Sequence, residues 1–117
     1  MLRTFVAMRV LVGGVTWLAP EHSARMSGFD PGANPQAAYW ARLFGVRDVV
    51  LGLAAHRSSG AARRRIVALT GACDAADLAA TVVGRRAGHV PPRAALLSGA
   101  VAAAAGAVAW AAASAVE

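Results

Sequence analysis

The sequence predicts an all-α fold, a four-helix transmembrane bundle, and three observations support this class. Apolar residues make up 57% of the 117 residues and gather in four runs, whereas soluble domains are about 45–50% apolar even with Gly counted. The Arg residues lie at the ends of these runs, as they would beside lipid phosphates. None of the runs alternates apolar and polar residues, and their Ala-rich composition favours helices over strands.

The predicted helices cover about residues 4–19, 37–56, 66–84 and 94–116, within one transmembrane domain over residues 1–117. Crossing the hydrocarbon core takes about 20 helical residues, so the first run is short and the uncharged fourth run is long enough. Pro20 ends the first run, and Gly, Asp, Asn and Pro residues over 25–36 predict turns. We expect a flexible basic loop over 57–65 and a basic turn over 85–93.

The first run has a second interpretation, a cleaved signal peptide that starts at Arg3. However, Arg9 interrupts the apolar run and no good Ala-x-Ala site follows it. These signs favour a retained helix.

Aromatic and basic residues predict how the chain lies in the cell membrane as a multi-pass protein. Trp17, Tyr39 and Trp40 fall at the same predicted interface, where amphipathic rings collect. A small excess of Arg at the N-terminal end and over 57–65 favours cytoplasmic termini. The Arg residues form no single stripe with interleaved aromatic residues, so the expected partner is membrane lipid and not nucleic acid.

The sequence offers no motif for catalysis, for a cofactor or for a metal. Cys73 is the only cysteine, and the three His residues are too far apart in sequence for zinc spacing. The chain has no Gly-rich phosphate loop after a strand and no Gly-x-Ser-x-Gly motif. We therefore expect a protein that is not an enzyme and has no cofactor.

Each predicted helix has one polar or small-residue face when its residues are placed about 100° apart. Small residues let membrane helices approach closely, and polar side chains find partners across the contact. We therefore expect a bundle, with the face of the last helix packed inside it or against another copy. The four faces, in chain order, are Arg9, Gly13 and Thr16; Ala41, Gly45, Asp48, Gly52 and Ala55; Thr70, Asp74, Asp77, Thr81 and Gly84; and Ala95, Gly99, Ala103 and Gly106.

Several ionisable residues are expected to converge on these faces. A short 57–65 loop makes the second and third helices antiparallel neighbours, and Asp48 and Asp74 each lie nine residues from that loop. Two Arg residues cannot neutralise three Asp residues unless Arg42 joins them. Otherwise one Asp is expected to be protonated, and Asp77 is the candidate because no Arg lies one turn away on its own helix. The predicted buried polar cluster is Arg9, Arg42, Arg47, Asp48, Asp74 and Asp77.

Two segments carry a resemblance to a known family. The first runs over 41–52 with Arg42, Gly45, Arg47, Asp48 and Gly52, and the second runs over 72–78 with Asp74 and Asp77. This pattern resembles that of small four-helix integral membrane proteins of actinobacteria, and the layout extends over the whole chain. That family has no assigned activity, so the resemblance implies the fold alone.

Three functions are compatible with such a bundle. The first is an accessory or scaffold subunit of a membrane assembly, either as a homo-oligomer or with a partner membrane protein. The second is a small oligomeric transporter or channel for protons or cations. The third is a membrane-embedded protein that binds a ligand or a lipid head group. A dry, fully paired cluster favours the scaffold, whereas a water-accessible Asp favours transport.

Overall fold

A computed structural model of the chain describes residues 1–115, which form five α-helices and no strand. The helices are α1 (Leu2–Leu18), α2 (Pro20–Met26), α3 (Ala37–Arg57), α4 (Gly60–Arg86) and α5 (Pro92–Ser114). The all-α prediction is confirmed, but the structure has one helix more than the four predicted. The predicted end of the last helix, at residue 116, lies outside the described residues.

Two of the helices in the described range, α4 and α5, are long and apolar enough to cross a membrane. α1 and α2 meet the same condition only together, as a pair bent by 113°. Large apolar side chains are exposed along the molecule, among them Leu11, Leu69 and Trp110. A soluble protein would bury such side chains, so these features indicate a membrane protein.

The chain between the first two predicted helices is more ordered than the sequence indicated. Pro20 ends α1 as expected, because proline cannot continue a helical hydrogen-bond ladder. It also starts α2, since proline is well tolerated at the first position of a helix. The four predicted helices did not include Pro20–Met26, and the turns predicted over 25–36 begin only after Met26.

The predicted flexible loop over 57–65 is also wrong. Only Ser58 and Ser59 separate α3 from α4, and Gly60 begins α4 with a φ of +52° that suits glycine. Ala61, Ala62 and the three Arg residues that follow are good helix formers, so the chain resumes a helix at once.

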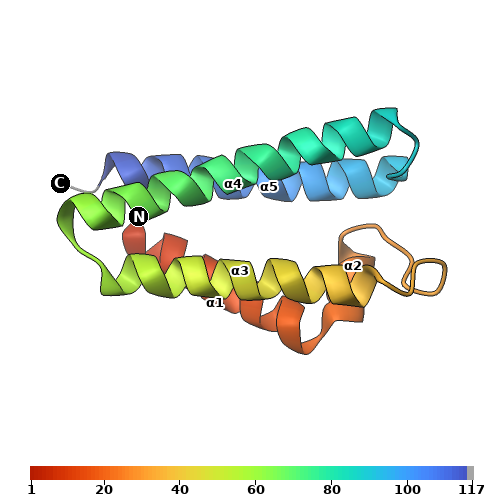
Figure 1. Cartoon of the computed structure of the whole chain (residues 1–117), viewed down its shortest axis with the longest axis horizontal. Helices are drawn as coiled ribbons and strands as arrows, with labels where there is room; N and C mark the ends of the chain where they lie inside the picture. Colours follow the sequence, from red (N-terminus) through yellow and green to blue (C-terminus); the bar gives the residue numbers. More distant parts are fainter. Residues whose placement is uncertain (116–117) are drawn as a thin grey trace.

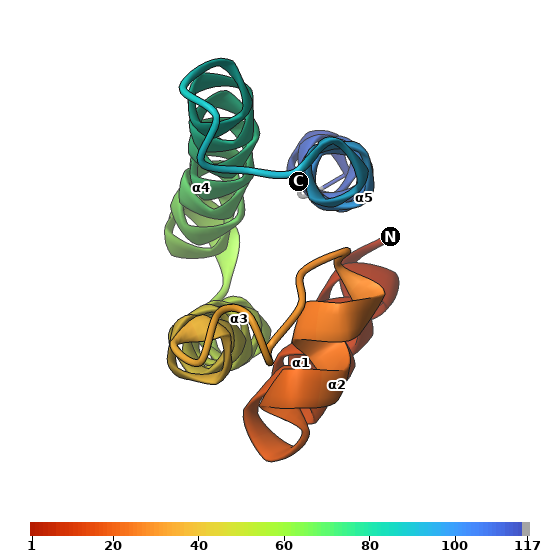
Figure 2. The ribbon, with the colours of Figure 1, turned by 90° about the vertical axis from the view of Figure 1, so that its right-hand side faces the viewer.

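The four long helices form two pairs, α1 with α3 and α4 with α5 (Figure 1). The end-on view shows the four long helices at separate corners, with α2 at the same corner as α1 (Figure 2). In the first pair, a Cβ added at Gly13 would lie 2.6 Å from the carbonyl oxygen of Gly45. In the second pair, Gly106 faces Asp74 and Gly99 faces Leu78 on α4. The small-residue face of α5 thus packs within the molecule at these two glycines.

The two pairs meet in an apolar core at the end where Ser58 and Ser59 link them. Phe5 of α1, Ala55 of α3 and Val67 of α4 are fully buried there, together with Ala109 and Ala112 of α5. At the opposite end the pairs lie farther apart (Figure 1). All four long helices therefore contribute to the core at one end only.

The contact between Gly13 and Gly45 predicts that alanine destabilises the protein at Gly45 and not at Gly14. Gly45→Ala should lower the melting temperature in detergent, because its Cβ would overlap α1 and overpacking costs about 1–3 kcal/mol. Gly14→Ala is the matched control, since no atom lies within 4 Å of its added Cβ and alanine favours helix. Equal melting temperatures for the two variants would contradict the close helix contact.

Candidate functional site

Arg9 is the centre of an ion network that joins three helices. Its side chain, on α1, is only 2% exposed. One terminal nitrogen donates a hydrogen bond of 3.1 Å to Oδ1 of Asp48 on α3, and the other pairs with Oδ2 of Asp74 on α4. Asp74 is itself only 3% exposed. A buried charge needs a partner of opposite sign, so α1 can pack here only with both neighbours in register.

Arg47 of α3 forms the second half of the network. It donates two hydrogen bonds, of 3.1 and 2.6 Å, to the two carboxylate oxygens of Asp77 on α4. Such a two-point pair fixes both distance and orientation. The same guanidinium lies 3.7 Å from Oδ1 of Asp48, and it covers the ring of Phe44 at 4.9 Å. The network is therefore continuous from Asp74 through Arg9, Asp48 and Arg47 to Asp77.

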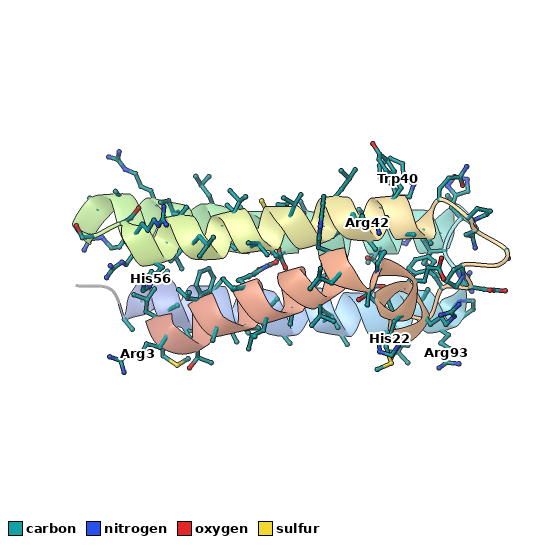
Figure 3. The ribbon with its side chains drawn as sticks, turned by 90° about the horizontal axis from the view of Figure 1, so that it is seen from below. Arg3, His22, Trp40, Arg42, His56 and Arg93 are labelled. Carbon is teal, nitrogen blue, oxygen red and sulfur yellow. The ribbon has the colours of Figure 1, made fainter. Side chains whose placement is uncertain are left out.

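Five of the six residues predicted for the cluster are brought together, and Arg42 does not join them. Arg42 is exposed and donates a 3.3 Å hydrogen bond to the carbonyl oxygen of Trp17. Figure 3 shows it near Trp40, at the α2 end of the molecule. The network thus contains two Arg and three Asp residues.

The expectation that Asp77 lacks an Arg partner is wrong. The partner comes from α3 and not from its own helix, so the spacing along α4 could not reveal it. Thr81, on the same face, donates to the backbone carbonyl of Asp77, and Thr70 donates to the carbonyl of Ile66. Neither threonine hydroxyl donates to the carboxylates.

Two aromatic rings that were not among the predicted site residues support the guanidinium groups. The guanidinium carbon of Arg9 lies 5.6 Å from the centre of the Phe5 ring, and that of Arg47 lies 4.9 Å from the centre of the Phe44 ring. Cation–π contacts of this kind favour a partly desolvated cation. In each case the ring precedes the Arg on the same helix, by four residues for Phe5 and three for Phe44. That spacing is the signal that could have identified both pairs.

The network forms one wall of a cavity of about 520 Å³ between the two helix pairs. The cavity reaches the surface beside the loop between α2 and α3, because exposed Asn34 and Gln36 are among its lining residues. Hydroxyl groups of Thr16, Ser23, Thr81 and Ser98 also line it, and most of the remaining wall is apolar. Apolar lining residues include Val12, Trp40, Phe44, Val101, Ala102 and Ala105.

Within residues 1–115 no group of three or more His, Cys, Asp or Glu side chains could hold a metal ion. No family model matches the chain, and no curated protein and no solved structure is significantly similar to it.

The burial of Arg9 predicts a strong coupling with Asp74. Arg9→Met leaves Asp74 buried without a cation, so the free energy of unfolding should fall by about 3–5 kcal/mol. Adding Asp74→Leu should recover most of the loss, because an apolar pair can replace a buried ion pair. Chemical denaturation of both variants in detergent measures the two effects.

The control for these two variants is Arg25→Met, which removes an exposed ion pair with Glu21 at 3.6 Å. Exposed pairs contribute less than about 1 kcal/mol. If Arg9→Met cost no more than Arg25→Met, the network would not hold the helices together.

Proposed function

We propose that this protein is a multi-pass protein of the cell membrane that binds a small amphipathic ligand between its two helix pairs. One observation carries the proposal: a buried ion network lies on the wall of a cavity that reaches the surface. Pockets of about 300–1,000 Å³ with mostly apolar walls and a few polar groups are typical of small-molecule sites. Ionisable groups inside membrane segments are rare, and where they occur they usually mark functional sites.

The distribution of side chains around α3 supports four membrane crossings. α3 does not meet the same condition as α4 and α5 because Arg42, Arg47 and Asp48 lie within seven residues of one another. Yet both Arg47 and Asp48 pair towards other helices. Its exposed side chains include the apolar Leu43, Val50 and Leu53. A helix with its charges paired inside and its apolar side chains outside is compatible with lipid.

The hydrogen bonding of the network favours binding over a purely structural role. The Nε atoms of Arg9 and Arg47 are buried and have no hydrogen-bond partner in the described structure. A partly satisfied buried network stabilises a protein less than well-packed apolar residues would. In addition, the side chains of Asp48 and Asp77 are 19% and 27% exposed, so the network is not sealed from its surroundings.

A second candidate is the accessory or scaffold subunit. The observation that favours it is the large apolar surface of α5, where Leu96, Val101 and Trp110 are exposed. Such a surface suits lipid and also suits a second membrane helix. The two candidates differ in what the cavity does, because a scaffold has no need of a ligand there.

The membrane proposal predicts the behaviour of the protein on extraction. It should stay with membranes in alkaline carbonate and should dissolve only in detergent, because its exposed apolar side chains would otherwise face water. Fractionation followed by immunoblotting measures this. Recovery of a monodisperse protein without detergent would contradict the proposal.

The ligand proposal predicts that filling the cavity abolishes binding. A thermal-shift screen with small amphipathic compounds of positive, negative and zero charge should find compounds that stabilise the protein. Ala105→Phe, which places a ring in the cavity, should remove that stabilisation. Ala104→Phe is the matched control, because Ala104 is exposed on the same helix and does not line the cavity. If no compound of any charge stabilised the wild type, the cavity would not be a ligand site.

A further inference from the structure

The charges on the cavity wall do not balance. Arg9 and Arg47 are the only cationic side chains among the described residues that line the cavity, and Asp48, Asp74 and Asp77 are the only acidic ones. With every group ionised, the wall carries a net charge of −1. In a low-dielectric site an uncompensated charge is relieved either by protonation of one Asp or by a bound cation, so the cavity favours a positively charged occupant over an anionic one.

Asp48 is the carboxylate that the two guanidinium groups hold least closely, although it lies near both of them. Arg9 is shared between Asp48 and the more deeply buried Asp74, while Arg47 gives both of its hydrogen bonds to Asp77. Both contacts of Asp48 use Oδ1, at 3.1 Å from Arg9 and 3.7 Å from Arg47. Its Oδ2 accepts no hydrogen bond from residues 1–115. This oxygen therefore remains able to face a cation.

The two guanidinium groups are not available to pair with an anionic ligand. The terminal nitrogens of Arg9 and Arg47 already face carboxylates, and their Nε atoms are buried. An anionic group would have to displace a carboxylate from an existing pair. Charge complementarity thus distinguishes between the two signs of ligand.

The remaining walls indicate the rest of the ligand. Phe44 and Trp40 present aromatic rings, and Val12, Val101 and Ala105 present aliphatic groups. Aromatic faces attract cations as well as apolar surface. A volume of about 520 Å³ is large compared with a single metal ion and suits a drug-sized molecule.

We infer that the cavity binds a monovalent organic cation with a bulky apolar body, and that the charge of this cation is compensated by Asp48. This inference rests on the proposed ligand site and names the class of ligand that it takes. The proposed site could exist with another class of ligand, so the two proposals can fail separately.

The experiment compares three probes of related shape and different charge: tetraphenylphosphonium, tetraphenylborate and the neutral triphenylphosphine oxide. Equilibrium dialysis against the full chain in a non-ionic detergent, corrected with protein-free micelles, measures saturable binding. Tetraphenylphosphonium should bind saturably and the borate should not. Because this comparison uses the wild type, it does not depend on how any variant folds.

The variant that tests the role of Asp48 is Asp48→Asn. It keeps the size of the side chain and an oxygen that can accept from Arg9, and it leaves two Arg with two Asp residues, so the variant should still fold. The affinity for tetraphenylphosphonium should drop on the order of tenfold or more, as when one partner of a desolvated charge pair is removed. Glu21→Gln removes one negative charge from an exposed side chain outside the cavity and should leave the affinity unchanged.

Three results would overturn the inference. Saturable binding of the borate or the neutral probe without binding of the phosphonium, if abolished by Ala105→Phe, would keep the ligand site and reject the cation. Wild-type affinity for the phosphonium in folded Asp48→Asn would reject Asp48 as the compensating group. If none of the three probes bound, the cation assignment would fail, and the broader thermal-shift screen would decide whether the cavity binds any ligand.

Discussion

The burial of one guanidinium group, that of Arg9, constrains the positions of three helices. A cation at 2% exposure is tolerated only with carboxylates against it, and these come from Asp48 on α3 and Asp74 on α4. α1 is therefore fixed along its length relative to both helix pairs. One turn further along α1, Gly13 lets α1 and α3 approach closely at Gly45. The charge sets the register, and the small residues set the distance between the helices.

The position of the network also explains the uneven packing of the molecule. On one side of it, the apolar core around Phe5 and Val67 draws the two pairs together. Towards the other end, the loop between α2 and α3 bridges the pairs: Ser98 donates to the carbonyl oxygen of Ser27, and Gly28 lies against Ala94. The cavity lies between this loop and the ion pairs of the network. The side chains that hold the pairs together are thus the same ones that give the cavity its polar wall. Stability and binding chemistry are coupled in these residues.

The sequence predicted the helices and the faces that carry polar residues, because a helical repeat fixes the direction of each side chain around its own axis. It could not predict which residues pair across helices. Asp77 was assigned no partner because Arg47 lies on another helix, and Arg42 was placed in the cluster although it turns to the backbone of Trp17. The cavity could not be predicted either, because it depends on the angle between the helix pairs. The helix bounds were predicted incorrectly near Pro20 and Gly60, because each of these residues starts a helix as well as marking a turn.

The unequal lengths of the helices have a consequence for the surrounding bilayer. α1 has 17 residues before its bend, which is about 25 Å of helix, whereas α4 has 27 residues, or about 40 Å. A hydrocarbon core of roughly 30 Å is thicker than α1, but it matches the run of α4 between Arg65 and Arg85, which is about 28 Å. Lipid beside α1 would have to thin, while the Arg residues at the two ends of α4 would lie among the head groups on either side of a core of ordinary thickness. Hydrophobic mismatch would then differ between opposite sides of one small protein, and the protein would deform the membrane asymmetrically around itself.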